Sequence, residues 1–239
     1  MLLPTLVSAE GLVVRSFNGD YSYQEGGGGR FSRGHVGQEL SLGTVIESGS
    51  GYLLLSIAEE MRLLLSPETR IEIRSVAPRQ EGLAVELRLF RGDMKVYVAT
   101  ATSTGSVIDI ETENAIVGTR GGQDGGVAVI SFDQERNETS LFAVAGRGYL
   151  RGRGITLKEA AGLSFDEGHM TLIKGNGSAS DPGPYDAATA PLGAIDITEE
   201  DVELPLPEGG QWGMSPMAYL ALGVLVLGIA FGVRRAVKS

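Results

Sequence analysis

The sequence predicts an all-β domain that is followed by an acidic linker and one transmembrane helix. Between residues 11 and 173, short runs rich in leucine and β-branched residues are interrupted by glycine every eight to twelve residues. This spacing is typical of the strands of a β-sandwich or barrel. Residues 175–211 are small, polar and acidic, whereas the run that begins at Met217 and ends at Val233 contains no charged residue.

The first 10 residues resemble the end of a signal peptide. They begin with MLLPTLVSA, a short apolar run that closes on the small-x-small pattern at residues 7–9, but they lack a basic start and a full-length apolar stretch. We interpret residues 1–10 as a truncated signal peptide that is cleaved after Ala9. The alternative is an ordinary first strand.

Alternating apolar and polar residues predict strands with one buried and one wet face. Ile71 and Ile73 alternate with charged residues, and residues 85–98 continue this pattern on both sides of the Arg-Gly-Asp sequence at 91–93. Because glycine favours turns, we predict that residues 85–98 form a hairpin that turns at this tripeptide. The pattern places Lys95 on the wet face.

Two segments are more densely apolar. Residues 52–57 and 62–65 suit strands that are covered on both faces. Later strands of the domain, which we place at residues 11–174, are expected at 127–132, 140–144, 148–151 and 154–157.

Residues 175–211 are predicted to be an acidic flexible linker. From residue 175 to residue 233 the chain has eight Asp and Glu residues and no Lys or Arg. A segment of this composition buries too little apolar surface to fold. One exception stays open, because residues 194–204 carry the only apolar cluster of the linker: Ile195, Ile197, Val202 and Leu204.

Residues 212–233 are predicted to cross a membrane. Seventeen uncharged residues, 217–233, extend about 26 Å as a helix, and the uncharged residues before them complete a hydrocarbon core of about 30 Å. Trp212 and Tyr219 suit one membrane interface, and Arg234, Arg235 and Lys238 mark the other side as cytoplasmic. The lipid bilayer is thus an expected partner, with the β domain outside the cytoplasm and residues 234–239 as a short cytoplasmic tail.

Composition argues against several classes of function. The chain has no cysteine, and its two histidines, His35 and His169, show no spacing suited to a metal or a catalytic pair. No catalytic constellation is evident, so we expect no enzyme, no cofactor and no metal. A net charge of -10, concentrated in the linker, argues against nucleic acid as a partner.

Five segments, in order, resemble the FecR-like domain family: GLVVRS, VGQELSLGTVIESGSGYLLLSI, MRLLLSPETRIEI, ELRLFRGDMKVYV and ENAIVGTRGG. The last of these, at residues 113–122, resembles the family's hallmark, whose valine-arginine-glycine core is matched by Gly118, Arg120 and Gly121. The resemblance covers about residues 11–173. It implies a jelly-roll-like β-sandwich of a bacterial envelope protein that acts in sensing or protein contact.

The chain departs from the family in two respects. The family's best-known regulator has a cytoplasmic sigma-binding segment before its membrane span, whereas here the domain comes first. Within the hallmark, Asn114 replaces the usual proline and Gly122 stands where threonine is common. For Arg120 we favour a structural role, in which its guanidinium binds backbone carbonyls, over a ligand contact.

The leading functional hypothesis is a non-enzymatic, membrane-anchored protein-interaction, scaffold or sensing module on the periplasmic side of a single-pass bacterial membrane protein. Its expected partner is an envelope protein. One alternative is a transmembrane signal transducer that acts through a membrane partner. Another is a cell-surface protein processed at its C-terminus, because residues 206–210 read LPEGG before the apolar span, although Gly209 stands where threonine is expected.

Overall fold

The chain forms β-strands throughout the part that the structure describes, which confirms the all-β prediction. The structure is a computed structural model. It describes residues 11–26, 28–58, 61–79, 82–99, 105–120, 125–152, 163–185, 190–192, 195, 197 and 204. All of these belong to one compact unit that ends at Pro205.

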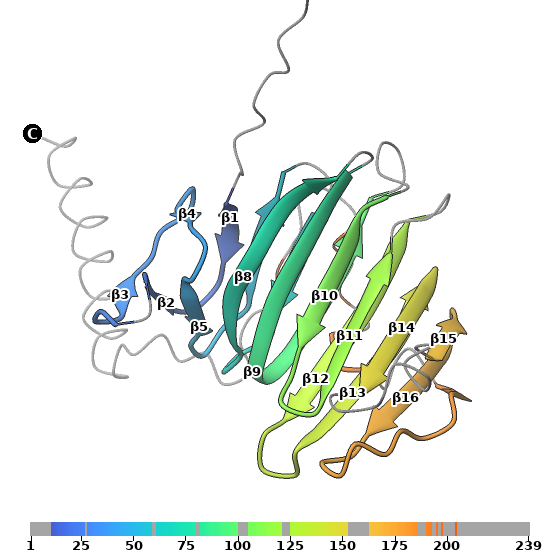
Figure 1. Cartoon of the computed structure of the whole chain (residues 1–239). Helices are drawn as coiled ribbons and strands as arrows, with labels where there is room; N and C mark the ends of the chain where they lie inside the picture. Colours follow the sequence, from blue (N-terminus) through green and yellow to red (C-terminus); the bar gives the residue numbers. More distant parts are fainter. Residues whose placement is uncertain are drawn as a thin grey trace, which may run out of the picture. The chain divides into compact units, whose positions relative to one another are not determined.

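The described strands form two sheets, called A and B, that share the long strand β9. Sheet B faces the viewer in Figure 1. Sheet A runs in the order β4 (Glu39–Leu40), β1 (Leu12–Phe17), β6 (Leu53–Ile57), β7 (Met61–Leu65), β9 (Gly82–Val98), β12 (Gly126–Asp133), β13 (Glu138–Ala145), β16 (His169–Ile173) and β17 (Gly183–Pro184). Sheet B runs in the order β3 (Ser32–Arg33), β2 (Tyr21–Gln24), β5 (Val45–Ser48), β8 (Arg70–Arg79), β9, β10 (Val107–Glu111), β11 (Ala115–Arg120), β14 (Arg147–Gly152) and β15 (Leu163–Asp166). These neighbours are antiparallel, except that β9 and β10 are parallel.

The inward faces of both sheets enclose one apolar core. Ile71 and Ile73 of β8 are fully buried in it, whereas Arg74 is exposed, as the alternation of the sequence predicts. Val85, Leu87 and Leu89 of β9 follow the same rule. Burial of each such side chain contributes about 1.5–3 kcal/mol, so the core is the main source of stability.

Residues 85–98 do not form the predicted hairpin. They belong to the single strand β9, whose first half pairs with β8 in sheet B and whose second half pairs with β7 and β12 in sheet A. Gly92 has a φ of +92° at the crossing point. A Cβ built there would lie 2.3 Å from Thr69 Oγ1 and 2.7 Å from Thr69 Cα. The glycine therefore redirects the strand between the sheets and permits close backbone contact with Thr69.

A buried hydroxyl network holds this crossing in place. Thr69 Oγ1 accepts a hydrogen bond from Asp93 N, at 3.1 Å, and is 3.1 Å from Asp93 O. Ser66 Oγ lies 2.9 Å from Thr69 Oγ1, and Ser48 Oγ accepts from Thr69 N at 2.9 Å. The ends of β5 and β7 and the start of β8 are thus joined to the crossing point of β9 through polar groups that are themselves satisfied.

A second buried network joins both sheets around Asn114, which is 5 % exposed. Asn114 Nδ2 donates to the carbonyl oxygens of Asn137, at 2.7 Å, and Ile173, at 3.1 Å. Its Oδ1 accepts from the hydroxyls of Thr112, at 3.1 Å, and Thr139, at 2.6 Å. These bonds tie the β10–β11 turn to the β12–β13 turn and to the end of β16. The proline expected at position 114 could supply neither the donor nor the acceptor.

The outward face of sheet A carries an apolar row with one lysine in it. Cross-strand register places in one line Leu54, Leu64, Lys95, Val129 and Phe142. The four apolar side chains of this row are at most 8 % exposed, and Lys95 is 4 % exposed. The prediction of a wet Lys95 is therefore wrong, whereas Leu54 and Leu64 confirm the prediction that β6 and β7 are covered on both faces.

The cover comes from residues that we expected in the linker. We call these residues the strap: Tyr185, Ala190, Leu192, Ile195, Ile197 and Leu204. Ile197 is fully buried against Leu54 and Leu64, and Ala190 packs on Val129 and Phe142. The apolar cluster that the sequence left open as an ordered piece is thus packed at its described residues Ile195, Ile197 and Leu204. Within the predicted linker, β17 also pairs with β16. The flexible linker stays a prediction for those residues of 175–211 that lie outside the described part.

Several predicted features lie outside the described residues. They are the signal-peptide remnant at 1–10, the span at 212–233, the tail at 234–239, and the interface residues Trp212, Tyr219, Arg234, Arg235 and Lys238. No helix in the described part has the length and apolarity that crossing a membrane requires.

Candidate functional site

The described residues contain no grouping of His, Asp and Glu side chains suited to a metal ion. His35 lies in the β3–β4 loop, where its Nδ1 is 3.0 Å from Val36 O, and His169 begins β16, where its Nδ1 is 3.2 Å from Glu167 O. His35 thus lies in a loop and His169 in sheet A, and each ring nitrogen is close to a backbone oxygen of its own segment.

Of the hallmark residues, Gly118 has a clear role. It lies in β11 between Asp109 of β10 and Tyr149 of β14. A Cβ at Gly118 would lie 2.0 Å from Ile108 O and 2.6 Å from the Tyr149 hydroxyl. The glycine therefore makes room for Tyr149, whose hydroxyl donates to Ile108 O at 2.9 Å and also contacts Asp109. The backbone of Arg120 ends β11, its side chain is not described, and Gly121 lies outside the described residues.

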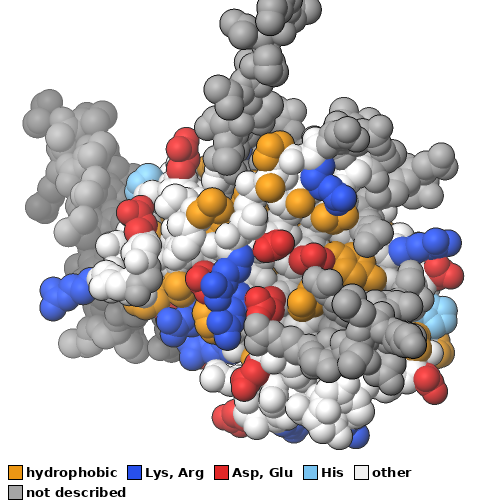
Figure 2. All heavy atoms as spheres, in the orientation of Figure 1, with side chains coloured by type: hydrophobic (Ala, Val, Ile, Leu, Met, Phe, Trp, Pro, Cys, Tyr) orange, Lys and Arg blue, Asp and Glu red, His pale blue; other side chains and the backbone are white. Residues whose placement is uncertain are grey.

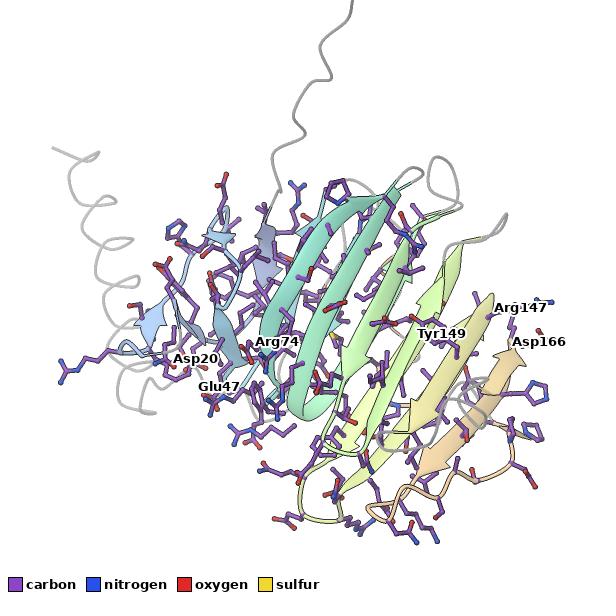
Figure 3. All side chains as sticks on the ribbon, in the orientation of Figure 1. Asp20, Glu47, Arg74, Arg147, Tyr149 and Asp166 are labelled. Carbon is purple, nitrogen blue, oxygen red and sulfur yellow. The ribbon has the colours of Figure 1, made fainter. Side chains whose placement is uncertain are left out.

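The outward face of sheet B bears charges that alternate between strands. In the strand register, Glu72 of β8 lies opposite Arg88 of β9, and Arg88 lies opposite Glu111 of β10. Figure 2 shows the basic side chains gathered on the side of β5, β8 and β9, next to a group of acidic side chains nearer the middle of the face. In Figure 3, Asp20, Glu47 and Arg74 lie at this basic side, and Tyr149, Arg147 and Asp166 lie across the sheet.

A stack of arginine and phenylalanine side chains stands at the basic side. The guanidinium of Arg70 lies 5.6 Å from the ring centre of Phe31 and 5.4 Å from that of Phe90. The guanidinium of Arg88 lies 4.9 Å from the ring centre of the same residue, Phe90. Phe31 is 40 % exposed. We call these four residues the Arg–Phe stack.

The positively charged guanidinium of Arg70 makes cation–π contacts with two aromatic rings. Its Nε is buried and has no hydrogen-bond partner among the described atoms. Its cross-strand neighbour Glu47 instead binds the guanidinium of Arg91, which also donates through Nε to Glu68 O at 3.1 Å. The two aromatic rings therefore hold the guanidinium of Arg70 in position, and not all of its N–H donors are used in hydrogen bonds.

An open cleft of about 630 Å³ adjoins the stack. Its lining includes Asp20, Tyr21, Arg33, Glu47 and Arg91. The backbone N–H of Ser50 donates to Asp20 and lowers the pKa of this carboxyl below its ordinary value. Burial raises the pKa of Tyr21 to about 12, and its hydroxyl donates to His35 O at 2.8 Å. The cleft is thus lined by acidic and basic side chains together.

The sequence did not predict this stack. Phe31 follows a glycine-rich loop, Arg70 begins β8, and Arg88 and Phe90 lie on β9. One signal was available, because Arg88 and Phe90 occupy consecutive outward positions of one strand. Their partners Arg70 and Phe31 could be identified only from the strand register.

No protein-family model matches the sequence, and no curated protein matches it. Two crystal structures of a proposed anti-sigma factor from Parabacteroides distasonis are similar to this chain, with TM-scores of 0.46 and 0.45 and sequence identities of 13% and 12%. Each similarity covers 59% of this chain and 60% of the other, so the chain spans about three fifths of those proteins.

Proposed function

We propose that this chain is a non-enzymatic protein-binding module that docks an envelope protein on the outward face of sheet B. In this proposal residues 217–233 anchor it in a bacterial membrane, with the β domain on the periplasmic side. The observation that carries the proposal is the Arg–Phe stack, in which Phe31 is exposed and the other three side chains are half-buried, on sheet B next to an open cleft.

The chemistry of the stack suits a protein interface. Arginine and aromatic residues are enriched at the centres of such interfaces, where they contribute most of the binding energy. Cation–π contacts at exposed sites are worth about 0.5–1 kcal/mol each, so the stack is ordered before a partner arrives. A preordered side chain loses less entropy on binding than a mobile one.

The partner surface is expected to carry carboxylates. The planar guanidinium of Arg70 suits bidentate contact with a carboxylate, and it lies against the rings of Phe31 and Phe90. The neighbouring Arg74 and Arg91 are already paired with Glu72, at 3.0 Å, and with Glu47. Arg70 is therefore the member of the basic group that we expect to contact a carboxylate of the partner, with Arg88 next to the same Phe90 ring.

Membership of the FecR-like family, with its jelly-roll-like topology, belongs to the same proposal. It is supported by the order of the resembling segments, because the segment at residues 61–73 covers β7 and the start of β8, and that at 113–122 covers β11. The close approach of Gly118 to Ile108 O gives a physical reason for the first glycine of the hallmark.

The topology is testable because the chain has no cysteine. In intact cells, the Ser178→Cys variant is expected to react with a membrane-impermeant maleimide, whereas Ser239→Cys is expected to react only after lysis. Ser178 is exposed in the turn after β16, so its labelling reports location rather than folding. The cysteine-free parent is the control. Labelling in the reverse order would place the domain in the cytoplasm and contradict the proposed location.

The docking face is testable by crosslinking in intact cells. We expect a photo-reactive residue at position 86, which is exposed on sheet B, to give one discrete adduct with an envelope protein. The same residue at position 135, in the exposed β12–β13 turn, is the matched control and is expected to give none. Charge complementarity at the stack is then tested by combining Arg70→Ala with Arg88→Ala.

The double variant is expected to lose at least about tenfold of the adduct, since two interface arginines worth about 1–2 kcal/mol each are removed. Its thermal unfolding must stay close to that of the parent for the comparison to hold. An adduct that is equally strong from position 135, or that is unchanged in the double variant, would contradict docking at this face.

A further inference from the structure

The strap binds the outward face of sheet A by contacts unlike those of the strands beneath it. Lys95 Nζ donates to Leu192 O at 3.3 Å and also to Ile195 O, and Arg62 Nη1 donates to Ile197 O at 3.1 Å. The hydrogen bonds that Leu192, Ile195 and Ile197 make to sheet A thus run from side chains to backbone oxygens, without a strand ladder. Tyr185, at the start of the strap, instead extends the β16–β17 pairing, because its backbone nitrogen donates to Gly168 O at 3.1 Å. Each of these side-chain bonds can be exchanged for a bond to water, so its net contribution to closure is much smaller than its strength in isolation.

The apolar part of the contact is also small. Ile197 is fully buried and Ala190 is 7 % exposed, whereas Leu192, Ile195 and Leu204 are only partly buried. The strap therefore rests on a few side chains, in contrast to the core that the two sheets enclose. Segments with few buried apolar contacts open at a lower free energy than the whole domain.

The face under the strap is built to survive exposure. Lys95 lies between Leu64 and Val129 in the apolar row, with its charged end directed to strap carbonyls. An ammonium group is strongly hydrated in water. When the strap leaves, hydration of Lys95 offsets part of the cost of exposing its apolar neighbours. A leucine at this position would instead favour permanent closure.

We propose that the strap is a releasable latch, which closes a peptide-docking face on sheet A in cis. The occupant of the face is the strap itself. Release makes the face available to a protein segment of the same chemistry, with branched apolar side chains for the Leu54–Leu64 site and backbone carbonyls for Lys95 and Arg62. Because the strap is the last described part of the chain before residues 205–239, a force or partner that acts on those residues reaches the latch before the core. This inference does not depend on docking at sheet B.

Two adjacent residues of β7 provide a matched test in the full-length, cysteine-free chain. Leu64 lies under the strap and Leu63 lies in the core, and both are fully buried. We expect the thiol of Leu64→Cys to react with a small disulfide reagent under native conditions at least about 100-fold faster than that of Leu63→Cys, since only the former needs strap opening alone. Val129→Cys and Ala128→Cys form a second pair with the same geometry, should the leucine variants fold poorly.

A weakened latch should increase the difference between the labelling rates at positions 64 and 63. Ile197→Asp is expected to accelerate labelling at position 64 at least tenfold and to leave position 63 within about threefold. Leu42→Asp, at a residue 52 % exposed, is the control and should change neither rate. Equal rates at the two positions in the parent, or equal acceleration by Ile197→Asp, would overturn the latch, because the strap would then open only with the whole domain.

Occupancy in trans completes the test. In the Ile197→Asp background, a synthetic peptide of residues 190–204 is expected to slow labelling at position 64 again. The same peptide carrying Ile197→Asp should not. Equal protection by both peptides, or by neither, would overturn the assignment of this face as a peptide-docking surface.

Discussion

The Gly92→Ala variant is expected to lose about 2–5 kcal/mol of unfolding free energy, which is a large part of the roughly 5–15 kcal/mol that stabilises an ordinary domain. Gly92 has a φ of +92° where β9 passes from sheet B to sheet A. An alanine in the left-handed region costs about 1–2 kcal/mol. Its Cβ would also lie 2.7 Å from Thr69 Cα, so that backbone must move, at a further cost of about 1–3 kcal/mol.

Gly43→Ala separates the two contributions. Gly43 has a φ of +79°, and a Cβ there would have no atom within 4 Å. Its loss is therefore expected to be the conformational part alone, about 1–2 kcal/mol. Chemical denaturation of both variants measures the difference. Equal losses at the two positions would show that the contact of Gly92 with Thr69 contributes nothing.

Asn114→Ala is expected to destabilise the protein by about 3 kcal/mol. The substitution removes the Nδ2 donor from two carbonyl oxygens, at 2.7 and 3.1 Å, and the Oδ1 acceptor from two threonine hydroxyls. Each buried polar group left without a partner costs about 1–3 kcal/mol. The loss is limited because the hydroxyls of Thr112 and Thr139, 2.8 Å apart, still pair with each other.

Two further variants identify the cause of this loss. Asn114→Asp keeps the size and the acceptor of the side chain but removes the donors, so at neutral pH it is expected to be at least as destabilising as alanine. Asn176→Ala removes an exposed asparagine that accepts from Ser178, at 3.0 Å from the backbone nitrogen, and should cost less than about 1 kcal/mol. Stability of Asn114→Asp close to that of the parent would contradict a structural role for the two donated bonds.

The strands of this domain could be predicted from local pattern, but their partners could not. Alternation at Ile71 and Ile73 identified a half-buried strand, because a strand with one buried face has an apolar residue at every second position. Gly92 was misread as a turn, since positive φ is needed both for a turn and for a strand that changes sheets. Only the register with β7, β8 and β12 distinguishes these cases.

The candidate sites depend on the same long-range information. Lys95 looked solvated because its strand neighbours alternate, and the strap that buries it is about 100 residues away in the chain. Arg70 looked like one charge among many until Phe31 and Phe90 were placed beside it. Asn114 was recognised as a departure from a family pattern, but its four partners come from three separate turns and strand ends.

The sharing of β9 between the sheets also sets an order of events during synthesis. The sheet A half of β9 has β7 on one edge and β12 on the other, so this half keeps an open edge until the chain has been made as far as Asp133. The sheet B half waits in the same way for β10, which ends at Glu111. Unpaired edges of apolar strands readily pair with other chains. A nascent chain that stalls between residues 98 and 107 would therefore present an unpaired edge on both halves of its central strand at once, and is the form most in need of a chaperone.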